Sequence, residues 1–222
     1  IWQTGRGYER EALFLQVIGE TGWSCVPHLQ QEVLSRLNRN IETIPNSIKD
    51  IHRRLDEAGL VELDRPWQQE GSSAGGRLPD IIRLSSRGRE AYRLLTGQEA
   101  KPSEFDVLIK AHKSPEHTLL NIQARWFLLK EEFEILAEAP AFKLSDGGSF
   151  QPDLAVVNTC GEVLYIEVER DASKNSERQA KWRNFHAATG GKLYIICDNR
   201  TCMRAIRNEV TSLLLQHTPG DL

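Results

Sequence analysis

The sequence lacks the features of membrane and secreted proteins. No apolar run approaches the length of about 18 to 20 residues that crosses a bilayer, and the N-terminus has no charged region followed by an apolar stretch. The four cysteines, Cys25, Cys160, Cys197 and Cys202, show neither CxxC spacing nor the density of a disulfide scaffold. We therefore expect a cytoplasmic protein with reduced thiols and no cysteine zinc site.

A large excess of positive charge is also absent. The formal net charge is −3 at pH 7, whereas affinity for phosphates comes mainly from lysine and arginine. Any contact with DNA must therefore use a local basic patch. The 222 residues suit two ordinary domains, which we place at 1–100 and 101–222. The sequence begins at Ile1 rather than at methionine, so a segment of a longer protein fits it as well.

The first half contains three stretches with helical spacing. Apolar residues predict a helix over 8–19, with Gly19 to Gly22 as its stop, and a second helix from Pro27 to about Leu37. A third helix over 45–59 has one apolar and one basic face. Its apolar stripe consists of Ile48, Ile51, Leu55 and Leu60.

The rest of this half predicts a hairpin and a last helix. Strands over 60–63 and 80–84 enclose a loop at 67–77 that is rich in glycine, serine and glutamine. Ser85 or Ser86 can cap a helix over 87–95, with Tyr92 and Leu95 on its inner face. Together these elements follow the order of a winged helix.

Two stretches, 55–62 and 82–88, resemble the end of the recognition helix and the strand after the wing in winged-helix transcription regulators. The resemblance implies that the third helix enters the major groove of double-stranded DNA. The residues expected at that interface are Asn46, Lys49, His52, Arg53, Arg65 and Arg77. The alternatives are a solvated helix face or a protein-docking module, and residues 1–100 carry 13 Lys and Arg against 14 Asp and Glu.

The second half predicts helices over 104–112 and 115–129, and then an acidic hairpin. Strands over 151–157 and 162–169 flank a turn at 158–161. Glu167 and Glu169 share one strand face because side chains alternate. If the loop is 159–161, with Gly161 left-handed, Asp153 pairs opposite Glu167, whereas a loop one residue longer undoes this alignment.

Three neighbouring carboxylates repel one another unless a cation joins them. Their oxygens are the ligands that Mg²⁺ or Mn²⁺ prefers. Asp153, Glu167 and Glu169 are therefore candidate metal ligands and catalytic groups for phosphodiester hydrolysis. The alternative is a solvated hairpin face.

The dipeptide Pro152-Asp153 and the stretch 167–169 resemble the motif of the PD-(D/E)xK nuclease superfamily. Glu169 stands where that family usually has lysine, although some restriction enzymes of this fold carry an acid-x-acid version. Lys181, on a helix expected over 173–186, is the candidate for the missing cation, and Lys174 is less favoured. A lysine at 181 could instead pair with Glu177 across one helical turn.

A second resemblance is to the replication-relaxation family of plasmid and mobile-element proteins. It rests on the stretches 117–121, 151–154, 166–171 and 181–185, and it implies a DNA-binding role in replication, mobilisation or DNA processing. His117, near a helix start, could contact metal, substrate or backbone, and Glu116 is a weaker candidate. Trp182 and Phe185, at helical spacing, favour the core over base stacking. The expected partner is double-stranded DNA, and replication or mobilisation proteins and a second copy of the chain in a homodimer are further candidates. No membrane contact is expected.

A strand over 192–197 and a helix over 201–216 complete an order that resembles the nuclease core. The expected fold is an α+β winged helix-turn-helix domain followed by an α/β restriction-endonuclease-like domain. Two functions remain: a Mg²⁺-dependent endodeoxyribonuclease, or a non-catalytic winged-helix transcriptional regulator or replication accessory factor with a degenerate nuclease fold. A third, weaker alternative is that both halves serve protein contacts.

Overall fold

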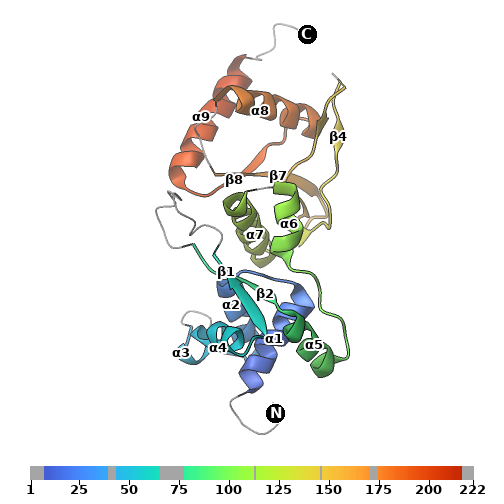
Figure 1. Ribbon diagram of the computed structural model, residues 1–222. Coiled ribbons are helices and arrows are strands. Elements are labelled where there is room, and N and C mark those ends of the chain that lie inside the picture. Colours follow the sequence, from blue (N-terminus) through green and yellow to red (C-terminus); the bar gives the residue numbers. More distant parts are fainter. Residues whose placement is uncertain are drawn as a thin grey trace. The chain divides into compact units, whose positions relative to one another are not determined.

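The computed structural model describes residues 8–39, 44–65, 78–112, 114–145, 147–170 and 175–216, and it is a mixed α+β structure (Figure 1). The chain divides into two compact units, Ile1–Leu119 and Leu120–Leu222, and the division falls inside helix α7 (Pro115–Lys130). No helix among the described residues is long and apolar enough to cross a membrane. The predicted loop at 67–77, with Arg77, and Lys174 lie outside the described residues.

The first unit follows the predicted order of helices and strands. Its elements are α1 (Glu9–Thr21), α2 (Val26–Arg36), α3 (Asn46–Lys49), α4 (Ile51–Glu57), β1 (Val61–Asp64), β2 (Ile81–Leu84), α5 (Ser86–Thr96) and α6 (Glu104–His112). The prediction of one helix over 45–59 is wrong, because the backbone at Asp50, with φ −97° and ψ 0°, separates α3 from α4. Ile48, Ile51 and Leu55 are nevertheless all buried, as their stripe predicted.

The core of the first unit is built around α1. Phe14 and Leu15 of this helix are fully buried, and Tyr92 of α5 packs beside it with 1 % of its surface exposed. A Cβ atom on Gly19 would lie 2.3 Å from the Tyr92 ring, so the close contact of the two helices requires glycine there. The inward position of Tyr92 is confirmed. The inward position predicted for Leu95 is wrong. Leu95 follows Tyr92 by three residues, which places its side chain about 60° away from that of Tyr92 around the helix axis, and it is 44 % exposed.

The hairpin of β1 and β2 leads directly into α5. The strands pair antiparallel, with Val61 opposite Leu84. Ser85 is the cap of α5, since its Oγ accepts a hydrogen bond from Gly88 N at 2.9 Å and donates one to the Gly59 carbonyl at 2.7 Å. The backbone of Gly88 lies so close to β1 that a Cβ atom would meet the Leu60 carbonyl oxygen at 1.8 Å.

Residues 101–104 are bonded to the end of α1. The backbone N–H groups of Lys101 and Glu104 donate to the carbonyls of Gly19 and Gly22, each at 2.8 Å. The Glu104 carboxylate accepts from Ser24 N at 2.8 Å. Helix α6 therefore begins from a segment that is held by both backbone and side-chain contacts.

The second unit contains a four-stranded mixed sheet. After α7 come β3 (Glu134–Ile135), β4 (Phe142–Lys143), β5 (Ser149–Phe150), β6 (Leu154–Val157), β7 (Val163–Glu169), α8 (Asn175–Thr189), β8 (Tyr194–Cys197) and α9 (Arg200–Gln216). The order in the sheet is β3-β6-β7-β8, with β8 parallel to β7 and the other pairs antiparallel, while β4 and β5 form a separate hairpin. The short strands β3 to β5 were not predicted.

Strand β7 has a different layer of side chains on each face. Leu164, Ile166 and Val168 pack against the later turns of α7. Tyr165 faces the opposite way, toward a cluster that includes Trp182 and Phe185 of α8. The sheet thus separates α7 from α8 and α9 (Figure 1). Trp182 and Phe185 are fully buried, which confirms their predicted place in the core.

Replacing Gly88 by alanine should destabilise the first unit. The added Cβ has no room beside the Leu60 carbonyl, so α5 must shift away from β1, at a cost of about 1 to 3 kcal/mol in the free energy of unfolding. Urea unfolding followed by circular dichroism measures this. Leu94→Ala is the matched control, because Leu94 lies on the same helix and is 75 % exposed. Equal midpoints for the two variants would refute the close contact.

Candidate functional site

The hairpin of β6 and β7 sets the position of the predicted acids. Val157 pairs with Val163 and Leu154 with Ile166. The turn closes with Asn158 N donating to the Glu162 carbonyl at 2.9 Å, and Gly161 has φ +80°. Continued by one residue, this register places Asp153 opposite Glu167. The predicted register and the left-handed Gly161 are therefore confirmed.

The three acids differ in their surroundings. Asp153 follows Pro152 just before β6, and its Oδ2 accepts a hydrogen bond from Val168 N at 2.8 Å. Glu167 is 1 % exposed, and the side chain of Glu169 is 14 % exposed. Because β7 turns Ile166 and Val168 toward α7, the two glutamates point toward α8. A solvated hairpin face is thus excluded for Glu167.

Lys181 of α8 reaches the same acids. Its Nζ forms ion pairs with Glu167 Oε2 and with Glu169 Oε1, the latter at 2.6 Å. The cation that the sequence placed on this helix therefore lies at the end of β7. The side chain of Glu177, the alternative partner, lies outside the described part of the chain.

The packing of α8 explains why Lys181 points toward the sheet. Trp182 and Phe185 are buried in the core, and Arg178 forms an ion pair with Glu209 of α9. The Glu209 carboxylate also accepts from Trp182 Nε1 at 3.4 Å. These contacts fix the rotation of the helix, and Lys181 is left on the side of β7.

Burial and charge together shift the protonation of this cluster. Burial, and after it the charge of Asp153, raise the pKa of the Glu167 carboxyl to about 8 against the opposing pull of Lys181. Burial by itself lowers the pKa of the Lys181 ammonium, but the carboxylates of Glu167, Asp153 and Glu169 outweigh it and raise that pKa. With every group ionised, three carboxylates and one ammonium leave two negative charges.

Two histidines, His112 at the end of α6 and His117 near the start of α7, lie next to each other. His117 lies in the first turn of α7, and its ring stacks on that of His112 with centroids 4.8 Å apart. The two imidazole rings could each offer a nitrogen atom to a metal ion. Glu116 accepts a hydrogen bond from Ser114 Oγ at 3.0 Å. Sequence reasoning missed His112, although its spacing of five residues from His117 was a usable signal.

The residues predicted to contact DNA are not all equally available. Asn46 and Lys49 of α3 are exposed. Arg53 is exposed and forms an ion pair with Asp50. His52 is half-buried, and burial lowers the pKa of its imidazole.

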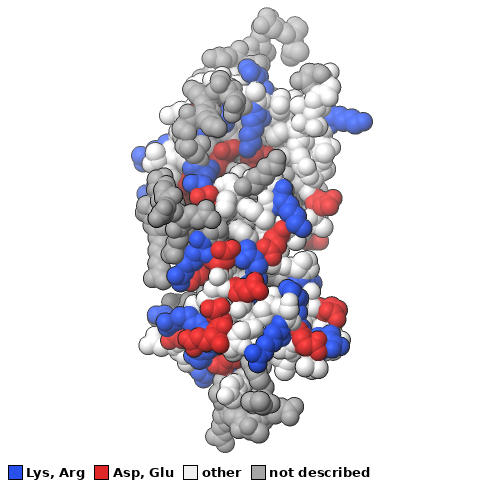
Figure 2. All heavy atoms as spheres, in the orientation of Figure 1, with Lys and Arg blue, Asp and Glu red and all other residues white. Residues whose placement is uncertain are grey.

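Two further arginines of this unit, Arg65 and Arg54, are paired with acids. Both oxygens of Asp80 accept from Arg65, at 2.7 and 2.9 Å, and Arg54 pairs with Glu11 at 2.6 Å. Figure 2 shows lysine and arginine interspersed with acids over the face in view. Arg53 and Arg65 are therefore both paired with acids, and Arg77 lies outside the described residues.

No protein-family model, no curated protein and no solved structure matches this chain. The function must therefore be argued from the site itself.

Replacing Glu167 by glutamine should change how stability depends on pH. The pKa of Glu167 is about 8 in the folded chain and 4.5 when unperturbed, so the unfolded state releases this proton first as the pH rises. Relative to Glu167→Gln, the wild type should lose stability between these two values, on the order of a few kcal/mol, with no further loss above. Urea unfolding at pH 5 to 9 in EDTA tests this, and parallel curves for the two proteins would contradict it.

Proposed function

We propose that the second unit binds a divalent cation through Asp153, Glu167 and Glu169 and hydrolyses DNA phosphodiester bonds, and that the first unit is a winged helix that binds the duplex. One observation carries the proposal. Lys181 joins both glutamates at the end of the same hairpin whose register sets Asp153 opposite Glu167. Three acids and a lysine are the groups that metal-dependent phosphodiester hydrolysis uses.

The donor set fits Mg²⁺ or Mn²⁺. All three acids offer carboxylate oxygens, which these hard cations prefer. Glu167 is buried, and a buried carboxylate is costly unless it is paired. When all three acids are ionised, Lys181 supplies one positive charge against three carboxylates, and a divalent cation would balance the two negative charges that remain.

Asp153 and Lys181 would have different roles in phosphodiester hydrolysis. A bound Mg²⁺ or Mn²⁺ supplies Lewis acidity toward a phosphate oxygen and a more acidic water. Asp153 is held in place by Val168 N, which orients its carboxylate before any ligand arrives. The Lys181 ammonium brings positive charge to the place where negative charge develops on the phosphate. The PD-(D/E)xK motif has a lysine at the position of Glu169, and in this chain Lys181 of α8 would supply that positive charge instead.

The first unit supports DNA binding by its order of elements and its exposed residues. Three helical segments, a two-stranded hairpin and a further helix follow one another as in a winged helix. Asn46, Lys49 and Arg53 lie exposed on α3 and α4, the segments that we propose as the recognition helix. Together with the resemblance to the replication-relaxation family, this favours a role in the replication or mobilisation of plasmids or mobile elements.

A second candidate function is a DNA-binding factor whose nuclease-like unit does not cleave. Lys181 already pairs with two of the acids, and such a bridge can serve to hold α8 on the sheet without any substrate. The two functions differ in whether Mg²⁺ or Mn²⁺ supports cleavage.

The cleavage test uses the full chain with supercoiled, linear and branched DNA. We expect nicking or cutting with Mg²⁺ or Mn²⁺ and none in EDTA. Asp153→Asn and Lys181→Met should each lower the rate by about a hundredfold or more, because the first removes a charged metal ligand and the second removes the positive charge that faces the phosphate. Mn²⁺ affinity, measured by calorimetry, should fall for Asp153→Asn, which loses a charged ligand, but not for Lys181→Met, which loses a cation that competes for the same carboxylates.

Glu162→Gln is the matched control, since Glu162 lies on the same hairpin but is exposed and pairs with Lys192. It should cleave like the wild type. Absence of metal-dependent cleavage in the wild type would leave the second candidate, and full activity of Asp153→Asn would reject the proposed site.

DNA binding is tested separately, in EDTA, by fluorescence anisotropy with a labelled duplex. Lys49→Ala combined with Arg53→Ala should weaken binding about tenfold or more and reduce its salt dependence, because two phosphate contacts are lost. Lys110→Ala combined with Arg93→Ala is the control, with two exposed cations on α5 and α6. Equal affinity of both double variants would move the interface away from α3 and α4.

A further inference from the structure

The first unit contains a pocket that the proposed function does not use. It has a volume of about 450 Å³ and lies between the end of α1, the hairpin of β1 and β2, the start of α5 and residues 100–106. Of the residues predicted to contact DNA, none that the structure describes lines it. Small-molecule sites are typically about 300 to 1,000 Å³, so its size suits a ligand of that kind.

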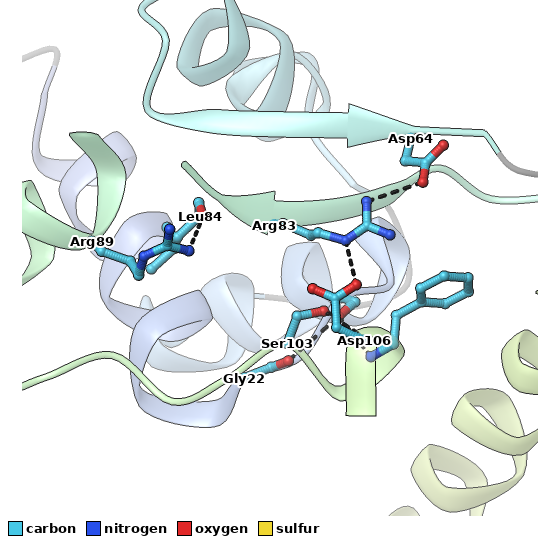
Figure 3. A network of polar contacts seen from close by, with 9 residues as sticks. Gly22, Asp64, Arg83, Leu84, Arg89, Ser103 and Asp106 are labelled. Atoms are coloured by element: carbon cyan, nitrogen blue, oxygen red, sulfur yellow. Dashed lines mark hydrogen bonds and ion pairs between the residues drawn. The ribbon is translucent and has the colours of Figure 1, made fainter. Parts of the chain in front are cut away.

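Two guanidinium groups line this pocket, and acceptors of the protein hold both in place (Figure 3). Arg83 Nε donates to Asp106 Oδ1 at 2.7 Å and Nη1 donates to Asp64 Oδ2 at 3.1 Å. Arg89 Nη1 donates to the Leu84 carbonyl at 2.9 Å. Groups that are already ordered lose little entropy when a ligand binds.

The charge of the lining is positive by one. Arg83, Arg89 and Lys101 face Glu62 and Asp106, and Asp106 is already paired with Arg83. Lys101 is exposed, while its backbone N–H is bonded to Gly19, so its side chain can move without loosening the segment. Arg89 and Lys101 are therefore the cations best placed to receive an anionic group.

The rest of the lining is apolar and includes one aromatic ring. Ile18, Trp23, Ile82, Leu84 and Ala100 contribute to it. An indole favours flat ring systems, which stack against it. The carboxylate of Glu62 is an acceptor for hydroxyl or amino groups of a ligand. A ligand that matches this lining has an anionic group, a flat ring and hydrogen-bond donors.

We propose that this pocket binds a nucleoside monophosphate, with its phosphate on Arg89 and Lys101 and its base against Trp23. The ligand would touch both strands of the hairpin and the segment that leads into α6. This site is independent of the acids in the second unit, and its test needs no metal.

The experiment is calorimetry with AMP, GMP, CMP and UMP on the full chain in EDTA, which keeps metal-bound nucleotide away from the second unit. At least one monophosphate should bind, and Lys101→Glu should weaken its binding about tenfold or more, because an attraction for the phosphate becomes a repulsion. Lys110→Glu makes the same change of charge on α6, outside the pocket lining, and should bind within about twofold of the wild type.

Three outcomes would overturn the proposal. These are no binding of any of the four monophosphates, equal affinity of Lys101→Glu and the wild type, and binding of inorganic phosphate as tight as that of the best nucleotide. The corresponding nucleoside without phosphate should bind about tenfold more weakly or not at all, and equal binding of the two would also count against the proposed place of the phosphate. Circular dichroism of each variant checks that it is folded.

Discussion

The ion pairs that Lys181 makes with Glu167 and Glu169 are what the second unit depends on. Glu167 lies on β7, one of the two inner strands of the sheet, on the face covered by α8, and is 1 % exposed. An isolated charge in such a place costs several kcal/mol, and the ammonium of Lys181 offsets part of that cost. The helix and the strand therefore have to meet in one register. The negative charge that Lys181 does not neutralise would also favour the binding of a metal cation by these acids.

The ion pairs of Lys181 also depend on how α8 packs. The lysine reaches β7 only because Trp182 and Phe185 are turned into the core and Arg178 is held by Glu209 of α9. The apolar layer on the far face of β7 is equally demanding, since its residues alternate with the acids along one strand. A shift of the β6 and β7 hairpin by one residue would turn the acids into the layer that packs on α7.

The sequence predicted those parts that depend on local rules. A three-residue turn with a left-handed Gly161 predicted Asp153 opposite Glu167, and the structure decides for it over a longer loop. Ser85 was one of two candidates for the helix cap, and it is the one observed. The sequence did not show the break at Asp50 or the two-residue strands, because such features depend on contacts that are distant in the sequence. The burial of Glu167 was equally hidden, since alternating glutamates on a strand resemble a solvated face until α8 covers them. The partner of Lys181 likewise had two candidates that only tertiary structure could separate.

Asp50 and Asp80 both pair with arginines that the sequence predicted to contact DNA, but the two ion pairs differ in strength. The pair between Arg53 and Asp50 is exposed on both sides, and such pairs contribute little because water and salt screen them. A phosphate could therefore replace Asp50 at small cost. Arg65 differs, because it is held by both oxygens of Asp80, whose side chain is only 12 % exposed. Bidentate pairs of this kind are stronger, so Arg65 serves the base of the hairpin, and the proposed contact with a duplex would fall to the residues of α3 and α4.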